Sequence, residues 1–185
     1  MFIQTESTPN PASLKFLPGK PVMGEGSADF ASASTAARSP LAGRLFEIAG
    51  VSGVFLGPDF ITVTKADGDW QHLKPAILGA IMDHYQSGAP VIAAEGAVST
   101  HAAHDEDSEE AMIVEQIKEL LDTRVRPAVA QDGGDIVFHG YANGVVFLHM
   151  RGSCSGCPSS QLTLKSGIEN MLRHYIPEVT EVRPV

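Results

Sequence analysis

The sequence predicts an α+β fold made of two small α+β domains, residues 1–90 and 109–185, joined by a flexible acidic linker over residues 91–108. Three observations support this prediction. The 185 residues, of which 43% are hydrophobic, suffice for one large domain or two small ones. Strand-like alternation and helix-like periodicity occur in both halves of the chain. Between the halves, small and charged residues dominate and leave little apolar surface to bury.

The first domain is expected to contain five strands and two helices. Polar and apolar residues alternate in the second strand, and the Gly57-Pro58-Asp59 turn joins the last two strands into a hairpin. Apolar residues at helical spacing mark both helices, and His72 and His84 are expected on the outer half of the second one. The expected strands are residues 2–5, 13–17, 28–31, 51–56 and 60–64, and the expected helices are residues 40–48 and 70–85.

The second domain is expected to run in the order helix, hairpin, loop, helix, strand. Its first helix carries apolar residues from Met112 to Val125 on one face, and Pro127 should kink or restart it. The run Asp132-Gly133-Gly134-Asp135 predicts a tight turn, and Asn143-Gly144 predicts the turn of the hairpin. The expected helices are residues 109–126 and 158–175, and the expected strands are residues 136–141, 145–150 and 179–183.

The two cysteines of the chain, Cys154 and Cys157, lie between a predicted strand and a predicted helix. Two thiols at this spacing can chelate a soft metal ion, form a small disulfide or act as a thiol-exchange pair. Pro158 suits the first turn of a helix, so the thiols should lie at a helix N-terminus. There the helix dipole and the nearby Arg151 favour thiolate, the form that binds metal. Cys154 and Cys157 are therefore the candidate metal-binding and cofactor-binding residues.

The number of thiols limits what one chain can bind. Iron–sulfur clusters and structural zinc sites usually take four protein ligands, and this chain offers two cysteines. The simplest way to complete such a site is a two-fold dimer in which each protomer supplies Cys154 and Cys157. A centre held by so few residues at an interface favours transient loading. The motif therefore indicates a carrier.

Charge and hydropathy argue against several other classes of function. The net charge is −9 and no basic stripe occurs, so nucleic acid is not an expected partner. No stretch approaches the roughly 18 consecutive apolar residues of a membrane-spanning helix, so no membrane association is expected. A start without a signal peptide or presequence, and only two cysteines, favour a soluble protein of a reducing compartment.

Two further polar groups carry weaker signals. His101 and His104 lie at helical spacing within the linker, but no third ligand is fixed nearby, so a solvated linker is expected there. Asp67-Gly68-Asp69 resembles the start of a calcium loop only superficially, because the remaining ligand pattern does not follow, and a turn is expected.

Two sets of motifs carry a resemblance to a known family. The C-terminal half contains Arg126-Pro127-Ala128-Val129, Gln131-Asp132-Gly133-Gly134-Asp135, Gly152-Ser153-Cys154-Ser155-Gly156-Cys157-Pro158-Ser159-Ser160 and Leu164-Lys165-Ser166-Gly167-Ile168-Glu169. The N-terminal half contains Phe2-Ile3-Gln4-Thr5-Glu6, Thr8-Pro9-Asn10-Pro11, Leu14-Lys15-Phe16 and Pro18-Gly19. The first set resembles the NifU-like C-terminal domain of the Nfu iron–sulfur proteins, and the second resembles the Nfu N-terminal domain found in mitochondrial and α-proteobacterial members.

This resemblance implies a scaffold or carrier that is not an enzyme. Such a protein binds a [4Fe-4S] cluster, made of iron and sulfide, on paired C-x-x-C motifs of a homodimer. It receives the cluster from upstream assembly proteins and transfers it to apo-protein clients. Cys154 and Cys157 fall on the family's ligand positions, and Ser153 stands where the family often has another small residue such as Ala. The expected location is the bacterial cytoplasm, or the mitochondrial matrix in a eukaryote.

Three alternatives use the same two thiols. A thioredoxin-like thiol–disulfide redox protein also places C-x-x-C at a helix start, but here the motif comes late and without a βαβ context. A structural zinc site shared across a dimer is chemically close to the cluster hypothesis. A local disulfide or idle thiols would leave the flanking glycines unexplained. Asp132 and Asp135 are interpreted as turn and capping residues.

Overall fold

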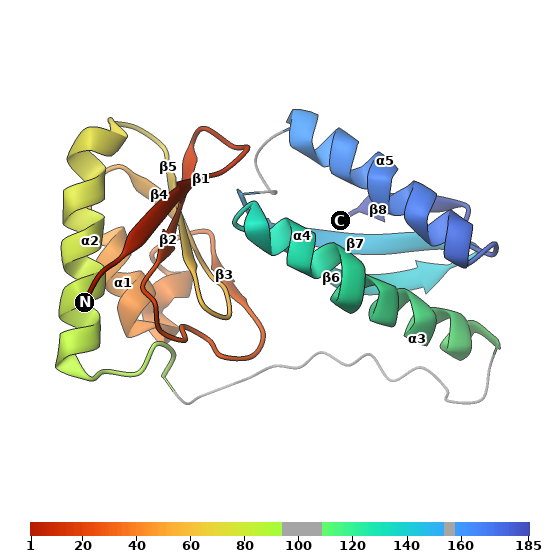
Figure 1. The fold of residues 1–185 in the computed structure, drawn as a ribbon, viewed down its shortest axis with the longest axis horizontal. Helices are drawn as coiled ribbons and strands as arrows, with labels where there is room; N and C mark the ends of the chain where they lie inside the picture. Colours follow the sequence, from red (N-terminus) through yellow and green to blue (C-terminus); the bar gives the residue numbers. More distant parts are fainter. Residues whose placement is uncertain (94–108, 154–157) are drawn as a thin grey trace.

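The computed structural model describes residues 1–93, 109–153 and 158–185, with side chains from residue 161 onward in the last segment. It confirms the α+β class: two sheets each carry helices on one face and enclose a separate hydrophobic core (Figure 1). The predicted linker and both cysteines lie largely or wholly outside the described residues. The domain boundaries at residues 90 and 109 therefore stay a prediction. None of the helices in the described part of the chain has the length and apolar content needed to cross a bilayer.

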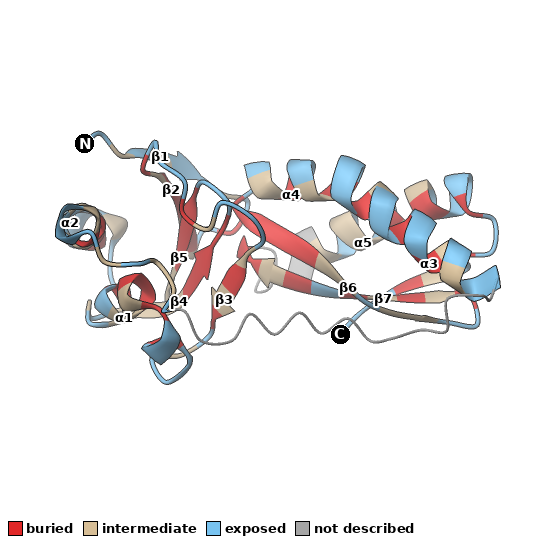
Figure 2. Cartoon of the chain, turned by 90° about the horizontal axis from the view of Figure 1, so that it is seen from below, coloured by how far each residue is buried: buried red, intermediate tan, exposed pale blue. Residues whose placement is uncertain are grey.

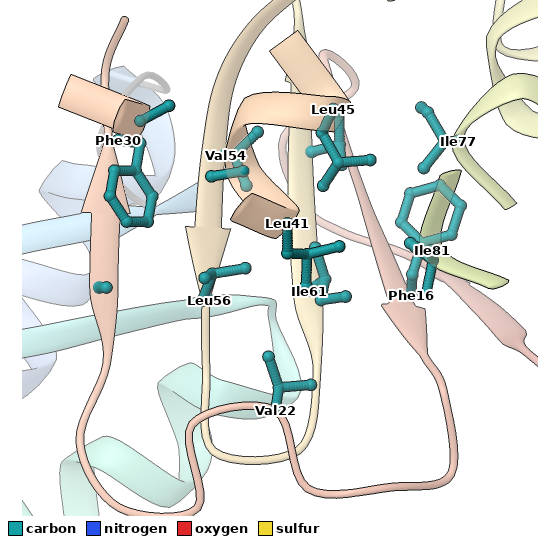
Figure 3. Close-up of a cluster of buried hydrophobic side chains, with 14 of the residues drawn as sticks. Phe16, Val22, Phe30, Leu41, Leu45, Val54, Leu56, Ile61, Ile77 and Ile81 are labelled. Atoms are coloured by element: carbon teal, nitrogen blue, oxygen red, sulfur yellow. The ribbon is translucent and has the colours of Figure 1, made fainter. Parts of the chain in front are cut away.

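The N-terminal domain is a five-stranded antiparallel sheet in the order β1-β2-β5-β4-β3, with both helices on one face. Alternate strand residues point toward the helices, so Phe16, Val54 and Ile61 meet Leu41, Leu45 and Ile77 in one apolar core (Figure 3). The elements are β1 (Gln4–Ser7), β2 (Ser13–Leu17), β3 (Ala28–Phe30), a 3-10 turn (Thr35–Arg38), α1 (Pro40–Phe46), β4 (Val51–Leu56), β5 (Ile61–Lys65) and α2 (Trp70–Ser87).

The prediction for His84 was wrong. This residue is fully buried, whereas His72 is exposed as expected. Leu73, Ile77 and Ile81 form the buried stripe of α2, and position 84 continues that stripe at i+3 from Ile81. Among the described residues, neither ring nitrogen of His84 has a hydrogen-bond partner. Burial, together with the positive charge of Arg44, lowers the pKa of His84, so the ring is held neutral inside the domain.

The C-terminal domain is a three-stranded sheet in the order β6-β7-β8, in which β7 is antiparallel to β6 and parallel to β8. Its helices cover one face and share a core with the strands (Figure 1). The predicted order of elements along the chain and the helix over residues 158–175 are confirmed. The elements are α3 (Glu109–Leu120), the π-helical segment η2 (Leu121–Val125), α4 (Arg126–Gln131), β6 (Gly134–Ala142), β7 (Val145–Gly152), α5 (Pro158–Tyr175) and β8 (Glu181–Pro184).

Three local details of this domain differ from the prediction or sharpen it. Pro127 lies in the first turn of α4, so the helix restarts there after the π-helical segment. Met112 is 62% exposed, because the buried stripe of α3 runs through Val114 and Ile117 instead. Asp135 belongs to β6 and not to the turn, because it pairs with Arg151 in the antiparallel register.

The second face of the N-terminal sheet lies against the C-terminal domain (Figure 1). On this face five neighbouring residues, one from each strand, form a row across the sheet, and we call it the cross-sheet row. Its members, in spatial order, are Glu6, Lys15, Thr62, Phe55 and Asp29. Phe55 and Phe60 are both 2% exposed although they lie outside the helix-covered core. Figure 2 shows buried strand residues on both sides of this junction.

Candidate metal centre

The two predicted ligands, Cys154 and Cys157, lie outside the described residues, but the structure describes the chain on either side of them. Strand β7 ends at Gly152, and α5 begins at Pro158. The predicted order of strand, cysteine segment and helix is thus confirmed by its two flanks, and Pro158 begins its helix as expected. The structure therefore shows how the chain is held at the end of β7, directly before the cysteines.

Two glycines make a close backbone contact at this strand end. Gly152 has φ +68°, and a Cβ placed on it would lie 2.7 Å from the Gly133 carbonyl oxygen and 3.1 Å from Cγ of Phe55. Gly133 has φ +76° in the turn that precedes β6. Both positions need the left-handed conformation that glycine adopts without strain. The predicted turn and the start of the cysteine segment are therefore packed backbone against backbone.

Ser153 fixes the same contact with three polar groups. Its hydroxyl donates to the Asp132 carbonyl oxygen. Its backbone N–H donates to the Gly133 carbonyl oxygen at 3.3 Å, and its own carbonyl accepts a hydrogen bond from Asn10 Nδ2 at 3.3 Å. Ser153 is 2% exposed, so these groups have little access to water. The hydroxyl that distinguishes Ser from Ala here is used to bind the turn.

An ion pair secures the other side of the turn. Asp135 accepts from Arg126 Nε at 2.9 Å and from Arg126 Nη2 at 3.0 Å, a bidentate arrangement. Ser27 of the N-terminal domain donates to the same carboxylate at 2.5 Å. The hydrogen bonds that Arg126 donates to Asp135 raise the pKa of Arg126 above its usual range. Asp135 therefore ties α4 to β6, a role that differs from the predicted turn or cap.

An acidic residue of the N-terminal domain lies close to a basic residue at the end of β7. Asp29 of β3 faces the end of β7, and burial raises the pKa of its carboxyl group. The positive charge of Arg151 and the backbone N–H of Gly152 oppose that increase. Arg151, which was expected to favour thiolate beside Cys154, thus also interacts with an acid of the N-terminal domain.

A groove of about 530 Å³ opens beside Ser153, between α5 on one side and η2 with α4 on the other. Its walls are mainly apolar, including Val125, Leu164 and Met171, and Pro9 of the N-terminal domain also lines it. Leu162, on the same helix, is 67% exposed. The surface next to the cysteine segment is therefore apolar and open, which is typical of a surface that contacts protein.

The other polar residues of the sequence form no second metal site in the described part of the chain. There, no three His, Cys, Asp or Glu side chains are grouped closely enough to hold a metal ion. Asp67 accepts a hydrogen bond from the Gly68 N–H at 2.7 Å, as expected for a local turn. His101 and His104 lie outside the described residues.

Sequence reasoning missed the contribution of the N-terminal domain to this region. Asn10, Ser27 and Thr62 contact the turn or the strand end, and none of them was a candidate. Phe55 does carry a signal: it lies between Val54 and Leu56, which point into the core, and an aromatic residue on the outer face of a strand indicates that this face is covered. Its partner could not be read from the sequence.

Both parts of the chain match known families. Residues 3–88 match the family model described as Scaffold protein Nfu/NifU N terminal, and residues 117–183 match the NifU-like domain. The mitochondrial NFU1 iron-sulfur cluster scaffold homolog of Homo sapiens is 54% identical over 187 residues, which cover 100% of this chain and 72% of that protein. The mitochondrial NifU-like protein 4 of Arabidopsis thaliana is 56% identical over 186 residues, which cover 98% of this chain and 65% of that protein.

The relatives named are longer than this chain, which spans 65% of the Drosophila sechellia homolog and 62% of the Drosophila virilis homolog. Among solved structures, the NifU-like protein of Saccharomyces cerevisiae aligns with a TM-score of 0.46 at 30% identity. That alignment covers 51% of this chain and 87% of the yeast chain.

Proposed function

The chain belongs to the Nfu family of scaffold proteins, and from this premise we propose that it binds a [4Fe-4S] cluster between two copies of itself and transfers it to apo-proteins. Cys154 and Cys157 are the proposed ligands. The observation that carries the proposal is the number and position of the thiols: two cysteines in the whole chain, at C-x-x-C spacing, between β7 and α5. A cluster with four protein ligands then requires a second copy.

The surroundings support a centre that accepts and releases its cargo. The strand before the cysteines is fixed by the glycine contact and by Ser153, while an open apolar groove lies next to it. A fixed strand end lowers the conformational entropy lost on cluster binding, because its backbone is already ordered before the thiolates bind iron. The exposed side chain of Leu162 and the groove offer a surface for a second protein chain.

Transfer then proceeds by exchange of ligands. A client thiol loses its proton, its thiolate binds iron, and the thiolate of Cys154 or Cys157 leaves and takes up a proton. Repetition of this step moves the intact cluster, and iron and sulfide keep their oxidation states. No bond of a turned-over substrate is broken, so the proposed role is that of a scaffold and not of an enzyme.

The proposed partners are upstream cluster assembly proteins and apo-proteins that need a cluster. The named relatives from human and Arabidopsis are mitochondrial proteins. For this chain we propose the bacterial cytoplasm, or the matrix if its source is eukaryotic.

Anaerobic reconstitution with iron and sulfide tests the proposal. The chain should gain a broad brown absorption and bind about four irons and four sulfides per dimer. Cys154→Ala and Cys157→Ala should each lose the cluster while they keep the wild-type circular dichroism, and Ser155→Ala, which leaves both thiols, serves as the control. Full cluster retention by both cysteine variants would contradict the ligand assignment. A monomer that takes up no iron but cycles between dithiol and disulfide would identify a redox protein, and zinc uptake without iron would identify a structural site.

A further inference from the structure

The polar groups buried in this molecule gather where the two domains meet. Eight polar or charged residues are buried in the described part of the chain, and five of them hydrogen-bond across the junction: Asn10, Lys15, Thr62, Asp135 and Ser153. A buried hydrogen bond contributes modestly when made, but its loss leaves an unpaired group at much greater cost. Such a set specifies one arrangement of the domains more strongly than an apolar contact of the same size would.

The contacts converge on the chain segments that start and end the β6–β7 hairpin. Lys15 Nζ lies 3.5 Å from the Gln131 carbonyl oxygen, and Thr62 Oγ1 donates to the Gly133 carbonyl oxygen at 2.7 Å. Phe55 packs against Gly152. These three are neighbours in the cross-sheet row, so one face of the N-terminal sheet contacts both the turn before β6 and the end of β7.

We propose that Thr62 and Asn10 are positioning residues for the metal centre, held on a different domain from its ligands. Thr62 is fully buried, and the carbonyl it binds also accepts the N–H of Ser153. Asn10 binds the carbonyl of Ser153 itself. The two side chains therefore fix, from outside, the last backbone groups before Cys154.

The side chain of Asn10 is itself held in place for this task. Its Oδ1 accepts the backbone N–H of Ala12 at 3.0 Å, which leaves the Nδ2 group pointing at Ser153. The Thr8-Pro9-Asn10-Pro11 run, which the sequence marks as a turn, thus presents a donor to the other domain. A strand end held in this way keeps the backbone that leads into Cys154 at a constant position relative to the sheet. Loss of the hydrogen bonds from Asn10 and Thr62 would let the strand end shift and would weaken cluster retention. This consequence rests on the proposed function.

Thr62 allows a closely matched test in the full-length chain. Thr62→Val keeps the shape and removes the donor, and Thr62→Ser keeps the donor. Thr64→Val is the control, because Thr64 lies on the same strand and face but bonds Ser13 within its own domain. Hydrogen exchange of the metal-free protein, measured on the peptide that contains the Ser153 amide, should be roughly fivefold faster in Thr62→Val than in Thr64→Val. Thr62→Ser should restore the wild-type rate.

The reconstituted proteins give the second readout. Thr62→Val should lose its cluster to a chelator roughly fivefold faster than wild type, with Thr64→Val and Thr62→Ser close to wild type. Asn10→Asp, which keeps the acceptor for Ala12 but turns a carboxylate toward the Ser153 carbonyl, should act in the same direction. Equal exchange rates in Thr62→Val and Thr64→Val would overturn the positioning role. If the wild-type chain takes up no cluster, the proposed function fails, and the exchange rates still decide the role of Thr62.

Discussion

The two domains place their polar residues differently. In the N-terminal domain the helix-covered face of the sheet is apolar, and the polar residues form a row on the opposite face, where they meet the other domain. In the C-terminal domain the polar groups concentrate at one end of the β6–β7 hairpin, around Asp132, Asp135 and Ser153. The candidate ligands follow directly after that end.

The two domains therefore contribute different parts of the candidate site. The N-terminal domain supplies a rigid apolar core and a polar surface, and no group of three possible metal ligands occurs in the described part of either domain. The C-terminal domain supplies the thiols, but four of the hydrogen bonds that order its turn and strand end come from its neighbour. The candidate site is therefore a property of the pair of domains.

Gly152→Ala should have the largest effect on stability, because it disrupts the place where the domains meet. An alanine at φ +68° is strained, and its Cβ would lie 2.7 Å from the Gly133 carbonyl oxygen and 3.0 Å from Gly134 Cα. Strain and overlap together should lower the free energy of unfolding by about 2–4 kcal/mol. Urea unfolding followed by circular dichroism measures this change.

Gly140→Ala is the control in the same hairpin. A Cβ at Gly140 would meet only Phe147 at 4.0 Å, an ordinary contact, and the residue has no positive φ. Its free energy of unfolding should change by less than about 0.5 kcal/mol. Equal losses in the two variants would mean that the hairpin as a whole, and not the junction, tolerates no added side chain.

The second largest effect should be a pH dependence of stability that arises from His84 in the N-terminal domain. His84 is buried and neutral, so its pKa in the folded state lies below the value of about 6.5 that it has when unfolded. The unfolded chain therefore binds a proton that the folded chain does not, and stability is lost as pH falls below about 6.5. The loss cannot exceed about 1.4 kcal/mol per pH unit, and it ends once the pH is below the pKa of His84 in the folded state.

The single tryptophan, Trp70, lies in the same helix as His84 and reports on the N-terminal domain. Urea unfolding monitored by its fluorescence at pH 7 and pH 5.5 measures the effect. His84→Leu should reduce the difference between the two pH values, while His72→Gln, at an exposed position, should leave it unchanged. If both variants keep the same pH dependence, the titrating group is not His84.

Periodicity was sufficient to predict the fold class and most of its helices and strands, because the spacing of apolar residues along the chain shows which face of each element is buried. Strand β2 and helix α5 begin and end where the sequence predicted them. His84 shows the limit of this reasoning, since a polar residue on a buried stripe cannot be told from one at its edge without the tertiary contacts. Met112 shows the converse, because an apolar residue one position off the stripe is exposed.

The sequence predicted only those parts of the candidate site that come from residues close together in the chain. Two cysteines two residues apart identify a ligand pair from spacing alone. Thr62 and Asn10 lie 71 and 143 residues from the groups they bind, and a threonine in a strand or an asparagine in a turn is unremarkable by itself. The role of Asp135 depends on Arg126, nine residues earlier, which the sequence pattern marked only as part of a helix end.

The smallest effects should show whether the domains unfold together. Gly79 in α2 and Gly167 in α5 have no atom within 4 Å of an added Cβ. Each is exposed to solvent and lies away from the ends of its helix. Alanine at either position should stabilise its own helix by about 0.5–1 kcal/mol. Because buried hydrogen bonds join the domains, Gly167→Ala should also raise the urea midpoint reported by Trp70, though by less than Gly79→Ala does. A Trp70 midpoint that is unmoved by Gly167→Ala would mean that the N-terminal domain unfolds alone, and the junction would then be too weak to order the strand end before Cys154.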